Sequence, residues 1–147
     1  MIEVQSPQEL IALTKESPLA SGELEVSQTM INAFVALCGD KQSIHQANHS
    51  SPAVVPGNLL IALIPGLLQS LFTIRQTSHC YTAKYNKIRF LEPIYANDSI
   101  RLAVSFKSAR ETTSKTVVTQ AVQVLRDTAV VAEAEIVDVY FFEKEKG

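Results

Sequence analysis

The most apolar run of the chain reads LLIALIPGLLQSLFT and occupies residues 59–73. It is apolar on nearly every helical face, which a surface helix does not tolerate but a helix covered on several sides by a sheet requires. We therefore predict a central helix from Leu59 to Thr73. Pro65 lacks the N–H that a helix interior uses, so a kink is expected between Ile61 and Pro65.

Four β-rich segments follow this helix, at residues 81–91, 99–109, 115–126 and 129–142. Leu102, Val104 and Phe106 alternate with more polar neighbours, which predicts strands with one packed and one solvated face. Turn-forming residues separate the segments, so adjacent antiparallel hairpins are the simplest topology. A central helix before such strands predicts an α+β fold, in which a curved antiparallel sheet of about five strands wraps the helix.

Two shorter helices are expected nearer the N-terminus. Ser6, Pro7 and Glu9 form a helix start with a capping box, and this helix should run to about Lys15. A short half-buried strand follows, where Leu24 and Val26 alternate with glutamates. Ser27 can then cap a helix that reaches Cys38, and Gly39 suits the left-handed position that ends it.

Length and composition predict a single domain covering residues 1–147. The net charge is −2 and the basic residues are scattered, which argues against a nucleic-acid partner. The central run is too short to span a membrane. Cys38 and Cys80 form no CxxC pattern and are expected to be free thiols, with no metal site. The N-terminal residues do not resemble a secretory signal, so a cytoplasmic location is expected.

Asp40 and His45 are the first candidates for a catalytic site. They set a carboxylate and an imidazole five residues apart just after a helix ends, and such a pair can hold and activate one water molecule. Gly57 opens the central helix, where a free backbone N–H can stabilise an anion. Simpler interpretations stay open at this point: Asp40 can be a turn residue and His45 a structural histidine.

Two basic residues, Lys87 and Arg89, share an expected strand face with Tyr85. A cationic face of this kind could contact coenzyme A phosphates or an acidic carrier protein, although solvated strand charges are more common. Asn58 could add a side-chain donor at the mouth of the site.

Three segments together resemble the MaoC-like dehydratases, most closely their NodN-like branch. These are residues 34–45 (FVALCGDKQSIH), the helix start from Gly57 to Pro65, and residues 85–94 (YNKIRFLEPI). The resemblance implies the hot-dog fold and a homodimer or dimer of dimers. It also implies that Asp40 and His45 are the catalytic pair and that Gly57 polarises a thioester carbonyl.

The function that this resemblance implies is (R)-specific hydration of trans-2-enoyl thioesters, or the reverse dehydration. No cofactor beyond the CoA or carrier-protein thioester is expected, and Ile44, Pro56, Asn58, Lys87 and Arg89 are the expected substrate contacts. The chain departs from the family pattern at Pro56, where histidine is common, and at Ala47, where an acidic residue is common. A hot-dog thioesterase and a non-catalytic acyl-binding module therefore stay as alternatives.

Overall fold

The computed structural model describes residues 2–16, 18–48, 51–75 and 77–143. Its helices are α1 (Pro7–Ala12), α2 (Gln28–Cys38) and α3 (Gly57–Gln69), with single 3₁₀ turns at Leu13–Lys15 and Ser43–His45. Its strands are β1 (Ile2–Val4), β2 (Leu19–Ala20), β3 (Leu24–Glu25), β4 (Phe72–Ile74), β5 (Thr77–Phe90), β6 (Ser99–Glu111), β7 (Thr116–Arg126) and β8 (Ala129–Phe142).

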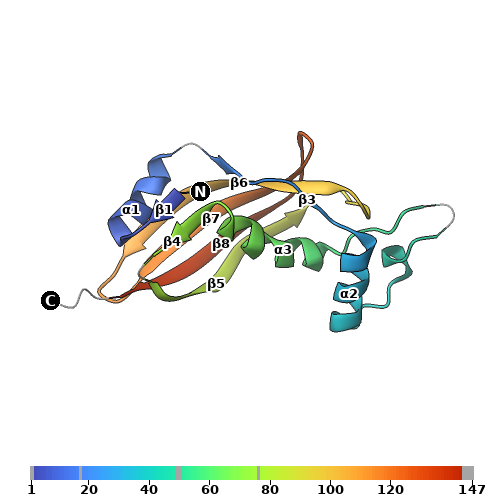
Figure 1. The fold of residues 1–147 in the computed structure, drawn as a ribbon, viewed down its shortest axis with the longest axis horizontal. Coiled ribbons are helices and arrows are strands. Elements are labelled where there is room, and N and C mark those ends of the chain that lie inside the picture. The colour runs from blue at the N-terminus through green and yellow to red at the C-terminus, as the bar shows by residue number, and fades with distance from the viewer. Residues whose placement is uncertain (1, 17, 49–50, 76, 144–147) are drawn as a thin grey trace.

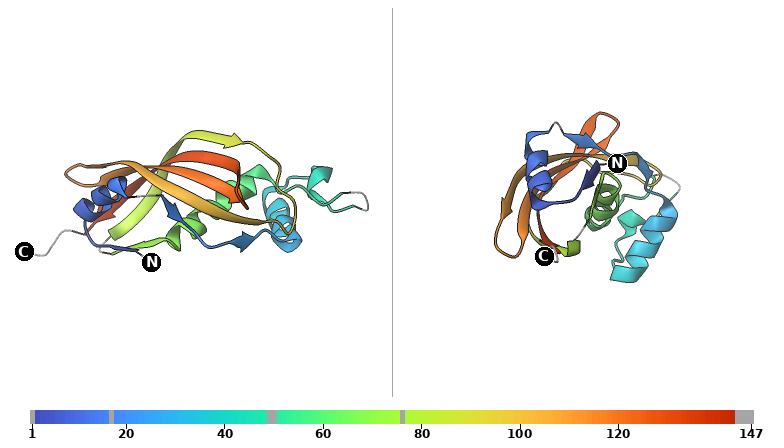
Figure 2. Two further views of the ribbon diagram at one scale, coloured as in Figure 1. Left: turned by 90° about the horizontal axis from the view of Figure 1, so that it is seen from above. Right: turned by 60° about the vertical axis from the view of Figure 1, so that its left-hand side comes forward.

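The main sheet has six strands in the order β2-β6-β7-β8-β5, with β3 also paired to β6. All of its pairings are antiparallel. The helix α3 lies along one face of this twisted sheet, whereas α2 projects from one end of the molecule (Figures 1 and 2). This arrangement confirms the predicted α+β fold, a sheet of about the expected size against one helix.

The pairing of β5 differs from the predicted series of adjacent hairpins. Only β6, β7 and β8 form consecutive hairpins, whereas β5 pairs with β8 at the edge of the sheet. The segment 91–98 therefore crosses the end of the sheet to reach β6, and an isolated bridge joins Val54 to Tyr95 there. The turn residues at this connection predicted that the chain reverses direction, but they did not predict which strand would pair with β5.

The central helix is shorter than predicted and is buried on one side only. It begins at Gly57 and ends at Gln69, and the last predicted residues instead form β4, which pairs in parallel with β1. Leu60, Ile64 and Leu68 are buried at four-residue spacing, whereas Ala62 and Pro65 are exposed. A single sheet covers only one helix face, so the expectation of burial on several sides is wrong within one chain.

Local capping signals agree closely with the structure. The Ser6 hydroxyl accepts the Glu9 N–H, and the Ser27 hydroxyl accepts the Met30 N–H, both at 3.2 Å. The Glu9 carboxylate accepts the N–H of Gln5 rather than that of Ser6. Gly39 ends α2 with φ at 78°, in the left-handed region.

The core lies between α3 and the inner face of the sheet. The predicted alternation is confirmed, since Leu102, Val104 and Phe106 are all buried, and Val118 and Val122 join them from β7. Cys38 and Cys80 are free thiols. No helix among the described residues has the length and hydropathy needed to cross a membrane.

Candidate active site

Asp40 and His45 lie in the loop that follows α2. The left-handed Gly39 turns the chain out of the helix, and the Asp40 Oδ1 then accepts the backbone N–H of Gln42 at 3.0 Å. Asp40 is therefore a turn residue and a candidate catalytic residue at once. His45 closes the following 3₁₀ turn, and its Nδ1 lies 2.7 Å from the carbonyl oxygen of Val54.

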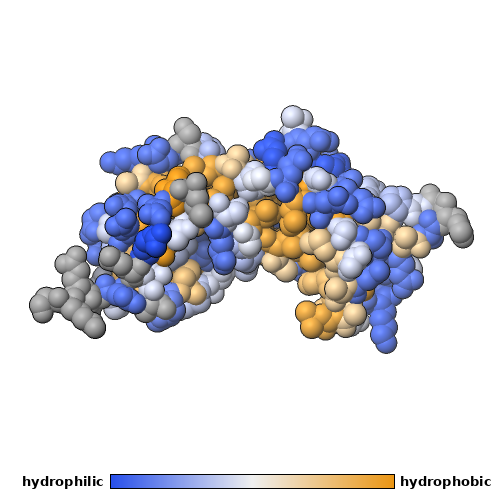
Figure 3. Space-filling view, in the orientation of Figure 1, coloured by the Kyte–Doolittle hydropathy of each residue, from blue (hydrophilic) through white to orange (hydrophobic). Residues whose placement is uncertain are grey.

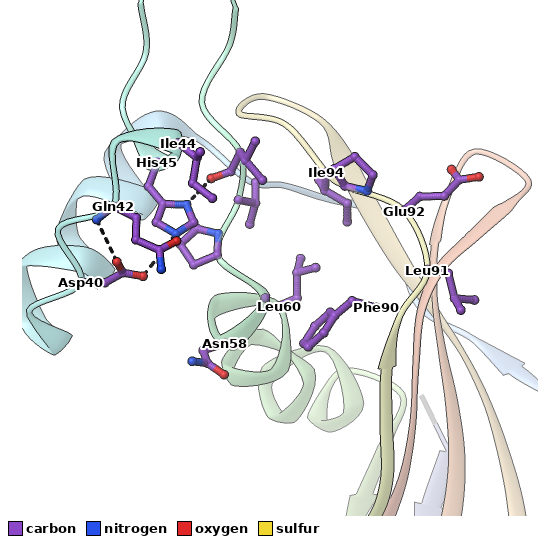
Figure 4. A pocket seen from close by; sticks show the side chains of 15 residues that line it. Asp40, Gln42, Ile44, His45, Asn58, Leu60, Phe90, Leu91, Glu92 and Ile94 are labelled. Carbon is purple, nitrogen blue, oxygen red and sulfur yellow. Dashed lines mark hydrogen bonds and ion pairs between the residues drawn. The ribbon is translucent and has the colours of Figure 1, made fainter.

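The two side chains face each other, as Figure 4 shows, with His45 Nε2 3.2 Å from Asp40 Oδ2. The Val54 carbonyl can only accept a hydrogen bond, so Nδ1 carries a proton and Nε2 is the nitrogen left for proton exchange. The His45 side chain is only 7% exposed, whereas that of Asp40 is 30% exposed. The imidazole is thus held in place while the carboxylate has access to solvent or substrate.

Gly57 lies across the same cavity at the first residue of α3. The first N–H groups of a helix have no intrahelical acceptor, so the Gly57 N–H is available to an anion. The ring of Phe90 lies close against this glycine: a Cβ placed on Gly57 would stand only 2.8 Å from the Phe90 Cζ. A larger residue at this position would therefore force the Phe90 ring to shift.

A cavity of about 500 Å³ connects these groups. It brings together three segments that are distant in the sequence: the loop after α2, the start of α3, and the end of β5 with its following turn. Of the predicted residues, Asp40, His45, Gly57, Ile44, Pro56 and Asn58 all line it. The predicted convergence of the pair with the helix start is therefore present in the structure.

Lys87 and Arg89 are not among the residues that line this cavity. Both approach Glu133 on the other face of the sheet, at 3.3 and 3.4 Å. A register shift between Tyr85 and Lys87 separates them from Tyr85, which lies opposite Ile136 on the inner face. The expectation that the three residues share one strand face is wrong, because a β-bulge changes the alternation.

Phe90 and Arg126 contribute to the site without having been predicted. Phe90 lines the cavity and is half exposed. Arg126 donates to the carbonyl of Pro93 at 3.0 Å and lies 3.3 Å from the carboxylate of Glu92, so it fixes the wall that these two residues form. Phe90 was recognisable as part of the 85–94 segment, but the contact of Arg126 depends on a strand far along the chain.

A metal site built from protein side chains needs at least three histidine, cysteine or acidic residues close together. Within the described ranges, no three such side chains come together. The Asp40–His45 arrangement itself is suited to moving a proton: it presents a fixed ring nitrogen, a partly exposed carboxylate and a helix N-terminus around one cavity.

Comparison with known proteins gives a structural relationship only. No protein-family model matches the sequence, and no curated protein is significantly similar to it. A MaoC-like dehydratase from Rhodospirillum rubrum superposes with a TM-score of 0.70 at 18% identity, covering 86% of this chain and 92% of that one. An (R)-hydratase from A. caviae, involved in PHA biosynthesis, gives 0.63 at 20% identity, covering 84% and 95%.

A third solved structure is a (3R)-hydroxyacyl-ACP dehydratase complex, HadBC, from Mycobacterium tuberculosis. It gives a TM-score of 0.67 at 13% identity, covering 84% of this chain and 96% of that one. The three superpositions cover 84–86% of this chain and 92–96% of the other chains. The chain therefore has the hot-dog fold, in the form found in MaoC-like dehydratases and (R)-hydratases.

Proposed function

We propose that the protein is an (R)-specific hydratase or dehydratase that interconverts trans-2-enoyl and (R)-3-hydroxyacyl thioesters of CoA or acyl carrier protein. The observation that carries this proposal is the convergence of Asp40, His45 and the start of α3 on one cavity. The structural likeness to (R)-hydratases supports the same reaction class. A thioester substrate of this kind fits a cytoplasmic enzyme with no further cofactor.

Hydration requires water at C3, a proton at C2 and stabilisation of negative charge on the thioester oxygen. His45 Nε2 takes the proton from a water that also hydrogen-bonds to Asp40, while the bond from Nδ1 to Val54 keeps the ring oriented. The proton that Nε2 takes from the water passes to Asp40 Oδ2 across the 3.2 Å contact, and Asp40 delivers it to C2; dehydration runs these steps in reverse. Positioned acid–base catalysis of this kind contributes about 10²- to 10⁴-fold.

The Gly57 N–H donates to the thioester oxygen as it becomes enolate-like. Loss of a comparable donor typically costs about 3 to 4 kcal/mol in the barrier. Pro56 adds no N–H, but its carbonyl accepts the N–H groups of Leu59 and Leu60 and so starts the helix. The histidine common at this position in the family is therefore dispensable for forming α3, and Gly57 supplies a backbone donor.

A homodimer is proposed from the unpaired edge of β5. One edge of β5 pairs with β8, and no other described strand pairs with its second edge. Apolar residues along and just after β5 are exposed, among them Tyr81, Ile88 and Leu91. Figure 3 shows further apolar surface over α3, whose outward face is only partly covered. Edges of this kind are usually paired or protected, and a second copy would do both.

The test of function is hydration of crotonyl-CoA, followed as loss of enoyl absorbance and as formation of (R)-3-hydroxybutyryl-CoA. His45→Asn keeps a donor for the Val54 carbonyl but removes the exchangeable nitrogen, and Asp40→Asn keeps an acceptor for Gln42. Each variant should lose about 10²-fold or more in kcat/KM. The matched control is His79→Asn, an exposed histidine on β5 that does not line the cavity, which should keep full turnover.

The same assay separates the alternatives. Thiol released in many equivalents over enzyme indicates a thioesterase, whereas the protein's own two cysteines can contribute at most a stoichiometric background. Loss of enoyl absorbance without thiol release supports the hydratase. Binding of crotonyl-CoA without any turnover would establish the non-catalytic module and contradict the proposal.

A further inference from the structure

A second cavity, of about 370 Å³, lies between the later half of α3 and the strands β5 and β8. Ile64 and Leu68 of the helix form one wall, and Thr82 and Asp138 of the paired strands form the opposite wall. None of these residues belongs to the proposed catalytic cavity. The helix side of the second cavity is mostly apolar, and its sheet side combines Thr82 and Asp138 with apolar residues such as Ile136.

The polar side is organised around Asp138, which is 8% exposed. Its two carboxyl oxygens accept hydrogen bonds from Thr82 Oγ1 at 2.8 Å and from Gln120 Nε2 at 2.7 Å. Each oxygen has two lone pairs, so Asp138 keeps capacity for another donor. Gln120 is fully buried, and its Oε1 has no hydrogen-bond partner within the described part of the chain. Gln120 does not line the cavity, so the acceptor that a bound group can reach in this cluster is Asp138.

Cys80 and Tyr140 are two further polar residues that line this cavity, and both hold their protons tightly. Burial and the nearby Asp138 raise the pKa of the Cys80 thiol to about 11, and burial also raises the pKa of Tyr140. The described lining residues include no lysine, arginine or histidine. A carboxylate or phosphate would therefore meet Asp138 with no compensating positive charge, whereas a neutral hydroxyl would meet an acceptor.

The cavity lies in line with the proposed catalytic site along α3. Leu60 lines the first cavity, and Ile64 and Leu68 line the second, at positions i, i+4 and i+8 of one helix face. The helix advances about 1.5 Å per residue, so Ile64 and Leu68 lie roughly 10 to 16 Å from Gly57. An extended chain covers about 1.2 Å per bond, so this distance corresponds to roughly nine to fourteen bonds.

We infer that the second cavity binds the far end of an acyl chain that carries a neutral hydrogen-bond donor, such as a terminal hydroxyl, which donates to Asp138. The inference rests on the proposed function for the position of the thioester at Gly57. It specifies the substrate as a medium-length acyl thioester with a polar tail. Ile64 and Leu68 contact the methylene groups, and the carboxyl group of Asp138 receives the hydroxyl.

The test compares binding of three saturated ligands, dodecanoyl-CoA, ω-hydroxydodecanoyl-CoA and ω-carboxydodecanoyl-CoA, by calorimetry. The hydroxylated chain should bind the wild type about tenfold more tightly than the plain chain, as expected for a hydrogen bond to a charged group. The carboxylated chain should bind least well. Equal affinities for the plain and hydroxylated chains would overturn the inference. A second copy of the protein that filled the cavity would give this same result.

Variants of Asp138 test whether its carboxyl group binds the terminal hydroxyl of the acyl chain. Asp138→Leu removes the acceptor and should abolish the preference for the hydroxylated over the plain chain. Asp138→Asn keeps the shape of the side chain and should reduce this preference to a few-fold. The asparagine variant serves as the test if the leucine variant does not fold. Glu135→Leu is the matched control, because Glu135 is on the same strand but pairs with Lys107 on the other face. It should keep the full preference. A preference that survives both Asp138 substitutions would contradict the assignment.

This binding assay is independent of turnover. If the protein prefers the hydroxylated chain but does not hydrate crotonyl-CoA, the inferred tail site stands and the proposed reaction is wrong. If the protein hydrates crotonyl-CoA but does not distinguish the hydroxylated from the plain chain, the proposed reaction stands and the inferred tail site is wrong. Failure to bind any of the three acyl-CoA ligands would contradict the inference directly.

Discussion

In the proposed mechanism, His45 has two separate tasks because its ring nitrogens face different partners. Nδ1 is held by the Val54 carbonyl, and Nε2 faces Asp40. Removing the whole side chain would therefore disturb the loop as well as the chemistry. Asparagine at this position can keep the first contact while abolishing the second, so it separates catalysis from folding more cleanly than alanine does.

Gly57 allows a test of the close contact between the start of α3 and the Phe90 ring at the proposed site. In Gly57→Ala the new methyl group would meet the ring of Phe90, which is half exposed and can move away into the cavity. We expect the variant to fold but to lose about tenfold or more in kcat/KM for crotonyl-CoA, because the displaced ring obstructs the thioester. Steady-state kinetics and thermal unfolding measured on one preparation check both parts.

Gly66→Ala is the matched control for this substitution, since Gly66 is on the same helix and a Cβ there would contact nothing within 4 Å. Alanine should stabilise α3 by about 0.5–1 kcal/mol and leave turnover intact. Replacing Phe90 by leucine in the Gly57→Ala background should restore part of the activity. If it does not, steric displacement of the ring is not the cause of the loss.

Cys80 predicts a pH dependence of stability. Its pKa in the folded protein is raised to about 11, chiefly by burial and then by Asp138, above the value of about 8.5 in an unfolded chain. The folded state therefore holds this proton more tightly. The resulting stabilisation is complete below about pH 8.5 and is lost as the pH rises through about 11.

The measurement is the free energy of unfolding in urea for the wild type and for Cys80→Ser, which does not titrate. The free energy of unfolding of the wild type, relative to that of Cys80→Ser, should decrease from pH 8 to pH 11. Thiol labelling gives a second readout: both thiols are exposed, and the raised pKa of Cys80 leaves it less thiolate, so Cys38 should react before Cys80 at pH 8. A difference that is constant with pH would exclude the raised thiol pKa.

At the scale of elements, the end of α2 determines where Asp40 lies. Gly39 has φ at 78°, a conformation that costs a residue with a Cβ about 1–2 kcal/mol. Gly39→Ala should therefore lower the free energy of unfolding by about 1 kcal/mol and reduce hydration, because Asp40 follows directly. Gly39→Asn should cost less on both measures, since asparagine tolerates the left-handed region. Equal costs for the two variants would show that backbone strain is not responsible.

The accuracy of the sequence predictions also depends on the scale of each element. Helix starts at Pro7 and Gln28, the Gly39 stop and the inward face of β6 were predictable, because each depends on neighbouring residues. The Asp40–His45 pair and Gly57 were predictable from local spacing together with the family resemblance. These features require no knowledge of what packs against them.

Features that depend on distant partners were not predictable in the same way. The place of β5 beside β8, the bulge that turns Tyr85 inward and the β4 strand after α3 all arise from pairing with remote segments. The polar cluster around Asp138 was missed for the same reason: Gln120 and Thr82 are on different strands and meet it only through the sheet.

At the scale of the whole molecule, a single copy of the chain leaves one sheet edge and part of α3 uncovered. The exposed residues of β5 and the partly covered outward face of α3 predict a dimer that pairs the β5 edges of two copies. Light scattering after gel filtration should give twice the mass of one chain. Ile88→Asp places a charge beside the unpaired edge and should shift the protein toward monomer at micromolar concentration.

Leu37→Asp serves as the comparison, because Leu37 on α2 is 86% exposed, more than any other large apolar residue among those described. A generic effect of removing exposed apolar surface would act on both variants, whereas pairing through β5 predicts dissociation only for Ile88→Asp. Dissociation caused by Leu37→Asp alone would place the interface on α2. Phe90 ends β5 and lines the proposed catalytic cavity. The Ile88→Asp monomer should therefore also lose part of its crotonyl-CoA turnover, which would link assembly to the proposed site.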